Sequence, residues 1–382
     1  MANALTALTP TLFSAARKDP RELTGILGHV TRDFNDRGVA KGDKVTISVA
    51  PVATVGDFTE SQTFTAGTDR TASSLELQLN RSKVSSFNLT GEQERSLFNG
   101  GTALDLMAQT LEQHFRAHIN AMETYAWQVA RAAASRATGT AGTDPFATDQ
   151  KPLADALKIL KDNGAGDREH AAIISTTAGA NLRKVANLFK VNEAGDPNLL
   201  RAGLLGNLYG IDVRESAAVT TTAIGTAASA TTNNAGYAVG ATTLTLAAVG
   251  TGTILAGDVV TFAGDSTQYV VKTGNADVSA GGTIVLQEPG LKVAMSAATK
   301  AITVGAIATA NIVLRRDAVV LVARPGIQPP GGGFESQVIS DPQTGLSFLL
   351  VRAVGNGMAS WYVRSVYDAF APNPYAIAQL LG

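Results

Sequence analysis

His114 and His118 are the residues whose type and spacing most directly suggest chemistry. They stand four positions apart in a stretch with helical periodicity, so both imidazoles would lie on one helix face, a spacing that can hold a metal ion. No third ligand accompanies them, because Phe115 and Arg116 between them supply none. Packing or a polar contact is the favoured interpretation, and we predict no metal site.

The other candidate motifs also lack the residues that their chemistry needs. The glycines of GLLGNLYG (203–210) have the wrong spacing for a nucleotide loop, and PPGGG (329–333) lacks the Lys and Ser/Thr of a phosphate loop. Ser85 and Ser86 have no nucleophile-elbow context, and the chain has no cysteine. No carboxylate pair stands out as an acid/base couple. We predict a protein that is not an enzyme, with no catalytic residues and no cofactor.

Composition narrows the class further. A chain of 382 residues can bury a large core and make two or three domains. Its formal net charge of −1 creates no overall field for nucleic acid or a membrane. Charged residues make up 16% of the chain, against the usual figure of about 25%. Extensive subunit contact would explain so little charge, and so would a Thr-rich β surface. The first residues predict no secretion signal.

The N-terminal part predicts an arm followed by a long β excursion. Residues 1–43 mix short helical pieces with turns and read as an arm with little core of its own. Strands are expected at 44–49, at 74–79 and, more weakly, at 83–89. In the second strand Leu75, Leu77 and Leu79 share one face. Since a lone hairpin is marginal in water, this excursion around residues 50–85 must lean on another surface.

The strongest helix signal covers residues 102–136 and would span roughly 50 Å. Thr102 is the expected N-cap. Apolar or amphipathic residues recur there at steps of three and four: Leu104, Met107, Leu111, Phe115, His118, Met122, Tyr125 and Val129. Helices at 152–163 and 178–190, with strands at 171–175 and 210–214, predict an α/β body around this long helix.

An all-β segment is expected to be inserted after this body, at residues 217–310. Residues 216–257 contain no Asp, Glu, Lys or Arg, and this stretch runs into β-like segments at 241–248, 258–262, 269–272 and 283–287. The turn spacing predicts a small barrel or sandwich with its own core. Thr and Ala dominate its first part, so residues 217–240 are expected to form a loose loop. Strands are predicted at 312–324, 334–339, 346–354 and 358–367, with a hairpin at Gly355-Asn356-Gly357 and an apolar tail at 376–381.

The order of these parts resembles the major capsid (coat) proteins of tailed bacteriophages, and most of all the short-tailed-phage coat proteins that carry an insertion domain. The resemblance covers nearly the whole chain and is one of order and texture. The matching stretches include KVTISVAPVATVGDFTE through SLELQLNRSKVSSFNL, ALDLMAQTLEQHFRAHINAMETYAWQVA, AAIISTTAGANLRKVANLF, LLGNLYGIDVRES, GDVVTFAGDSTQYVV, RRDAVVLVARP, DPQTGLSFLLVR and WYVRSVYDAFAPNPYAIAQLL.

The resemblance implies an α+β fold with peripheral and axial domains. The implied parts are an N-terminal arm (1–43), an extended loop with flanking strands (44–100), a spine helix with the peripheral/axial body (101–216), an inserted β-barrel-like domain (217–310) and a return to the axial/peripheral domains (311–382). Candidates for contact with a neighbouring subunit are Glu60, Arg70, Leu75, Leu77, Leu79 and Lys83. Some relatives join subunits through a Lys and an Asn, for which Lys83 and Asn356 are the positions here, although Asn-Gly is ordinary turn chemistry.

The implied function is structural. Pentamers and hexamers of the chain would tile an icosahedral head shell around double-stranded DNA, without sequence-specific binding and without a membrane. A scaffolding protein, a portal and a decoration protein would be partners, with assembly in the host cytoplasm and a final place in the virion. Two alternatives stay open: a tail or fibre protein, and a carbohydrate-binding adhesin or an enzyme with such a module. Shells, fibres or small particles in negative stain would separate them.

Overall fold

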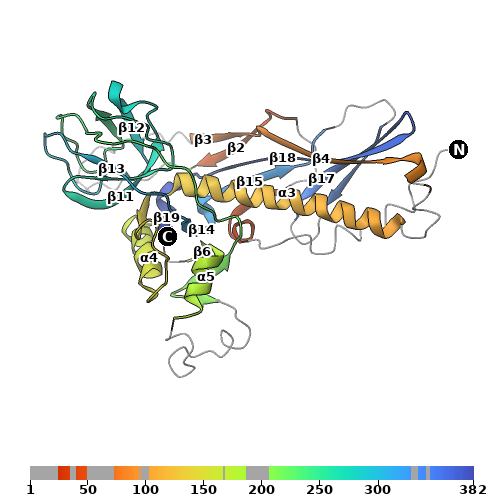
Figure 1. Cartoon of the computed structure of the whole chain (residues 1–382), viewed down its shortest axis with the longest axis horizontal. Coiled ribbons are helices and arrows are strands. Elements are labelled where there is room, and N and C mark those ends of the chain that lie inside the picture. The colour runs from red at the N-terminus through yellow and green to blue at the C-terminus, as the bar shows by residue number, and fades with distance from the viewer. Residues whose placement is uncertain are drawn as a thin grey trace, which may run out of the picture.

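The structure is a computed structural model. It describes residues 25–34, 40–49, 73–93, 95, 103–166, 168–185, 206–327, 334–340 and 345–382. Within these residues two β-sheets lie end to end along the long axis of the molecule, and one long helix, α3, runs beside both (Figure 1). The strands β9–β13 lie at one end, and the shorter helices α4 and α5 lie below the second sheet.

Helix α3 (Ala103–Ala133) confirms the predicted long helix. Its 31 residues correspond to about 46 Å at 1.5 Å per residue. The apolar stripe is buried over almost its whole length, as expected from the spacing of three and four. The buried residues of the stripe are Met107, Leu111, Phe115, Ile119, Met122, Ala126, Trp127 and Ala130.

The first sheet has six strands. They are β1 (Thr31–Phe34), β4 (Arg81–Thr90), β15 (Val320–Arg324), β16 (Phe334–Ser340), β17 (Ser347–Gly355) and β18 (Met358–Phe370). The long strand β18 organises it, because β17 pairs with its first part, β15 with its last part, and β4 with most of its length. The predicted hairpin is confirmed: Asn356 (φ 49°) and Gly357 (φ 76°) both have positive φ, as a type I′ turn requires.

The expected β excursion begins as a two-stranded sheet of β2 (Lys44–Val49) and β3 (Ser73–Gln78). Leu77 and Leu79 are buried beside this hairpin in a small cluster with Val320, Val322 and Val366 of the first sheet. The hairpin does pack against another surface, as predicted, but that surface belongs to the same chain. The expectation that these two leucines need a neighbouring subunit is therefore wrong.

The second sheet has eleven strands. Its body strands are β5 (Arg136–Thr138), β6 (His170–Ile174), β7 (Asn207–Leu208), β8 (Ile211–Glu215), β14 (Ala310–Arg315) and β19 (Ile377–Leu381). Strands β6 and β8 are parallel, with α5 (Thr176–Leu182) in the connection between them, which agrees with the α/β pattern. Helix α4 (Lys151–Asp162) confirms the helix expected at 152–163.

Three expectations for this region need correction. The strand predicted at 312–324 is two strands in different sheets, because the short 3-10 helix η4 (Arg316–Ala318) interrupts it. The apolar tail at 376–381 is strand β19, which lies between β14 and β5 inside the sheet. The helix expected at 178–190 starts earlier, because the Ser175 hydroxyl caps its first turn, and it ends at Leu182; residues 186–190 lie outside the described residues.

The remaining strands of the second sheet come from the segment that the sequence predicts to be inserted. They are β9 (Thr243–Leu246), β10 (Val259–Phe262), β11 (Asp265–Thr273), β12 (Gly282–Leu286) and β13 (Ile302–Val304). Their side chains form a hydrophobic cluster separate from the main core, around residues such as Leu244, Val260 and Tyr269. The segment also joins the body directly, since β11 pairs with β5.

Residues 217–240 do not form the loose loop that their composition suggests. Isolated β-bridges join Ala228 to Thr251, Thr231 to Ala301 and Tyr237 to Met295 in the strands and loops of the segment. Thr232 is completely buried. Backbone pairing therefore orders this stretch even though it has few large apolar side chains.

The packing of α3 leads to a stability prediction. Phe115 is buried and its ring lies 5.1 Å from that of Phe348 on β17. Replacing Phe115 with Ala should lower the free energy of unfolding by about 3–5 kcal/mol, because the change removes a large apolar side chain and leaves a cavity. Urea denaturation measures this. The control Gln113→Ala, at an exposed position of the same helix, should change stability by less than about 0.5 kcal/mol. Equal effects of the two variants would contradict the described packing.

Candidate functional site: the sheet junction and the open sheet face

The two histidines on α3 take part in packing and hydrogen bonding. The His118 Nδ1 atom lies 2.8 Å from the Ser365 hydroxyl, and Nε2 lies 3.1 Å from the Val363 carbonyl oxygen. A neutral ring fits both contacts when Nε2–H donates to Val363 and Nδ1 accepts from Ser365. His114 instead stacks on Phe87 with ring centroids 5.2 Å apart. Over the residues that the structure describes, no group of three potential metal ligands gathers around them or elsewhere.

Burial lowers the pKa of His118 from 6.5 to about 4. Because the folded pKa is lowered, the unfolded chain takes up a proton first, and stability is lost as the pH falls from about 6.5 towards 4. Between pH 7.5 and 4.5 the loss should be about 2–3 kcal/mol from this group alone. His118→Gln, which cannot be protonated, should flatten the pH dependence in urea unfolding by that amount. An unchanged slope in the variant would refute the assignment.

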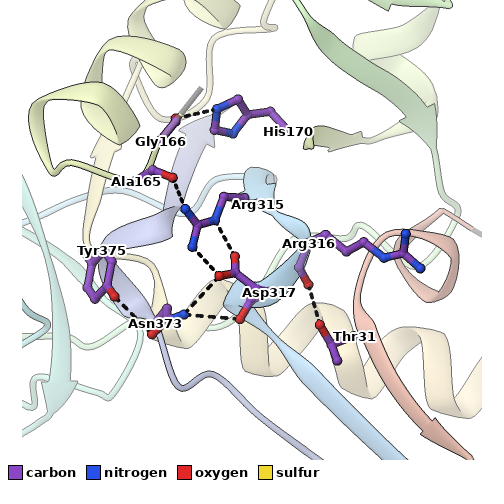
Figure 2. Close-up of polar contacts among 9 residues, drawn as sticks. All are labelled: Thr31, Ala165, Gly166, His170, Arg315, Arg316, Asp317, Asn373 and Tyr375. Carbon is purple, nitrogen blue, oxygen red and sulfur yellow. Dashed lines mark hydrogen bonds and ion pairs between the residues drawn. The ribbon is translucent and has the colours of Figure 1, made fainter. Parts of the chain in front are cut away.

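The chain passes between the two sheets at a compact polar junction (Figure 2). Strand β14 ends at Arg315, whose guanidinium pairs with Asp317 in η4 and also donates to the carbonyl oxygen of Ala165 after α4. Asp317 accepts a hydrogen bond from Asn373, at 3.5 Å, which lies where the chain returns from β18 towards β19. Arg315 and Asp317 thus link the two segments that cross between the sheets, β14 to β15 and β18 to β19. Arg315 also binds them to the end of α4.

A third crossing lies beside these two. The Thr31 hydroxyl donates to the Arg316 carbonyl oxygen at 3.2 Å, and the Thr31 N–H donates to the Val319 carbonyl oxygen at 3.0 Å. From there β1 runs parallel to β15. The guanidinium of Arg324 pairs with the Asp33 carboxylate at 2.7 Å. Hydrogen bonds or ion pairs therefore hold each of the three crossings that the structure describes.

The inserted segment is attached at the C-terminal end of α3. Arg131 donates to the Gly257 carbonyl oxygen at 3.3 Å, and the Gln287 amide donates to the Ala132 carbonyl oxygen at 2.8 Å. Asp258 accepts from the backbone N–H groups of Gly225 and Leu255. Burial raises the pKa of the Asp258 carboxyl group. The contacts of Arg131 and Gln287 set the position of the segment relative to the helix, whereas those of Asp258 lie within the segment.

The residues predicted to contact a neighbouring subunit lie in different parts of the chain. Glu60 and Arg70 lie outside the described residues, and Leu75 stands opposite Ile47 in the β2–β3 register. Lys83 is exposed on β4, opposite Ser365 of β18. Asn356 lies beyond the other end of that pairing, where Met358 stands opposite Thr90. A Lys83–Asn356 bond within one chain is thereby excluded, since the ladder between them spans more than about 20 Å.

One face of the six-stranded sheet exposes apolar side chains. Register places Val338, Leu349, Arg364 and Val84 opposite one another across β16, β17, β18 and β4, on the face away from α3. Leu349 is buried within this row, and the two valines on either side of it are exposed. Val84 is 60% exposed and Val338 is 41% exposed. Phe334 and Met358 lie on the same face, at 52% and 42% exposure. We call this surface the open face. The sequence pattern did not predict it, because the pattern was not used to separate strands buried on one face from strands buried on both.

The polar junction was missed as well. Arg315 and Asp317 looked like ordinary charged residues. So did Glu123, a buried residue of α3 whose carboxylate accepts hydrogen bonds from backbone N–H groups of residues 25–27. It interrupts the apolar stripe of α3 immediately after Met122. A carboxylate within a buried stripe is the signal that could have identified it. None of the helices in the described parts of the chain is long and apolar enough to cross a membrane.

Comparison with known proteins gives structural similarity only. No family model and no curated protein matches the sequence. Similar solved structures include the mature capsid of bacteriophage PhiM1, with 14% identity and TM-score 0.44 over 93% of this chain and 85% of that one. The capsid of a native GTA particle has 9% identity and TM-score 0.46 over 94% and 90%. A virus-like particle from Pyrococcus furiosus has 9% identity and TM-score 0.44 over 99% and 100%. At these values the similarity carries no functional conclusion for this chain.

Proposed function

We propose that the chain is a major capsid protein of the tailed-bacteriophage kind, which assembles with copies of itself into a closed icosahedral shell around a phage genome. The open face is the observation that carries this proposal. It presents Val84, Phe334, Val338 and Met358 on one side of a sheet that α3 braces from the other side. Exposed apolar surface on a rigid sheet is typical of a protein–protein contact.

The shape of the subunit supports the same proposal. Helix α3 lies along the long axis beside two sheets that are placed end to end, so the described part of the molecule is elongated (Figure 1). A subunit of this shape can contact several neighbouring subunits along its length. The low share of charged residues, 16%, agrees with extensive contact between copies.

The finer parts of the proposal follow the family resemblance. We assign an N-terminal arm, an extended loop, a spine helix with peripheral and axial domains, and an inserted β-domain, with the ranges 1–43, 44–100, 101–216, 217–310 and 311–382. The separate hydrophobic cluster around Leu244 and Tyr269 supports an inserted domain, and its presence favours the short-tailed-phage group. Expected partners are further copies in pentamers and hexamers, a scaffolding protein, a portal, packaged DNA and a decoration protein. Assembly would take place in the host cytoplasm and end in the virion.

Purified protein, alone or with its scaffolding protein, should form closed particles in negative stain and sediment far above its 39.4 kDa subunit mass. Fibres would favour the alternative of a tail or fibre protein. Small particles under all conditions, including with the scaffolding protein, would refute the shell proposal and leave the adhesin or enzyme alternative.

The open face gives a sharper test with a matched control. Val338→Asp should abolish closed particles, because a carboxylate would have to be desolvated in the contact between copies. The folded subunit should lose less than about 1 kcal/mol of stability, since the side chain is already partly exposed. Val354→Asp is the control: Val354 is 59% exposed and stands opposite Ala359, on the other face of the same sheet.

Electron microscopy of both variants shows whether closed particles form, and urea unfolding measures the stability of the subunit. Particles from Val354→Asp but not from Val338→Asp would support the open face as the contact surface. Normal particles from Val338→Asp would exclude it.

A further inference from the structure

Glu123 is a buried carboxylate that binds backbone rather than a cation. Its Oε1 atom accepts hydrogen bonds from the N–H groups of Gly25, at 2.6 Å, and Ile26, at 2.8 Å, and Oε2 accepts from Leu27, at 3.0 Å. The Ser216 hydroxyl donates to Oε1 at 2.9 Å. The residue is 2% exposed. Four donors directed at one carboxylate give strong, charge-assisted hydrogen bonds.

The segment held in this way, residues 25–34, is called the strap here. It starts beside the second sheet, where Gly25 lies against Ser216 and Ile173. It continues through the 3-10 helix η2 (Ile26–Gly28) and ends as β1 on the edge of the first sheet, next to β15. The strap therefore crosses from one sheet to the other over the polar junction.

Apolar burial and the hydrogen bonds of Glu123 together hold the first part of the strap. Ile26, Leu27 and Val30 are buried in the main core. The N–H groups of Gly25, Ile26 and Leu27, however, have the Glu123 carboxylate as their partner. Without it three buried donors would be unsatisfied, which is unfavourable for the docked position. The backbone of the strap is thus held in place by one side chain of α3, in addition to the burial of its apolar side chains.

We propose that Glu123 is a positioning residue for assembly: it docks the strap across the junction and so fixes the first and second sheets of the subunit relative to each other. The role in assembly rests on the proposed shell function. The docking itself does not, because it follows from contacts within one chain.

Amide hydrogen exchange, followed by mass spectrometry of peptides that cover the strap, measures the docking. Glu123→Gln keeps the shape of the side chain but removes its charge and turns one acceptor into a donor that faces N–H groups. Exchange in residues 25–30 should rise at least about tenfold, while β6 and β14 keep their protection. Glu112→Gln, the same change at a half-buried position of α3, should leave the exchange of the strap unchanged.

Gly25→Ala tests the same docking without altering a charge. An added Cβ would lie 3.1 Å from the Cβ atom of Ser216 and 3.3 Å from Cγ2 of Ile173, so the strap and these neighbours must shift by a few tenths of an ångström, which should loosen the docking. Faster exchange confined to the strap is again expected. If Glu123→Gln fails to fold, the test uses Gly25→Ala and Ser216→Ala. The second change removes the hydrogen bond to Glu123 and the one that the Ala218 N–H donates to the same hydroxyl.

Negative-stain images of the assembled variants measure the positioning role. Wild type and Glu112→Gln should form the same particles, whereas Glu123→Gln and Gly25→Ala should form open or irregular ones. Unchanged exchange in the strap overturns the docking, and faster exchange with normal particles overturns the positioning role. If the wild type forms no shells, the shell function and the positioning role both fail, and the exchange data still decide whether Glu123 docks the strap.

Discussion

The rest of the structure depends on the burial of one face of α3 against two sheets at once. Phe115 packs on Phe348 in the first sheet, and the Trp127 indole donates to the Ala310 carbonyl oxygen in the second, at 3.1 Å. An α-helix bends little over this length unless something interrupts its hydrogen bonds. Helix α3 therefore sets the distance and the angle between the sheets, and the β2–β3 hairpin and the inserted segment take their places relative to it.

Polar groups have a specific task in a chain with so few charges. Where the polypeptide leaves one sheet for the other, its backbone groups have no ladder partner, and side chains supply one. Arg315 and Asn373 do this at the junction, and Glu123 does it for the strap. Asn311 does it within the second sheet, where it accepts from the Ser175 N–H and donates to Leu380. Most of these contacts are hydrogen bonds to backbone, which need a particular geometry, and they make the arrangement of the sheets specific.

The sequence predicted the elements that have a strong period and missed those that depend on partners far along the chain. The long helix followed from its apolar stripe, and the β17–β18 hairpin followed from Asn356-Gly357. The break at Arg316 could not be predicted, because both flanking strands are apolar and only their sheets differ. Leu77 and Leu79 were correctly expected to need cover, but nothing local shows whether that cover comes from the same chain or another one. Glu123 was missed for the same reason, since its partners are about a hundred positions away.

Strand β19 has a consequence for the order of folding. Its residues, Ile377–Leu381, lie between β14 and β5 and join, through strand ladders in the described sheet, the β14 side to the strands of the inserted segment. During synthesis the two halves of that sheet must wait, each with an unpaired edge, until residue 381 has left the ribosome. Closure of the sheet must therefore follow the synthesis of every other described strand, and the two halves have no fixed register with each other before that point.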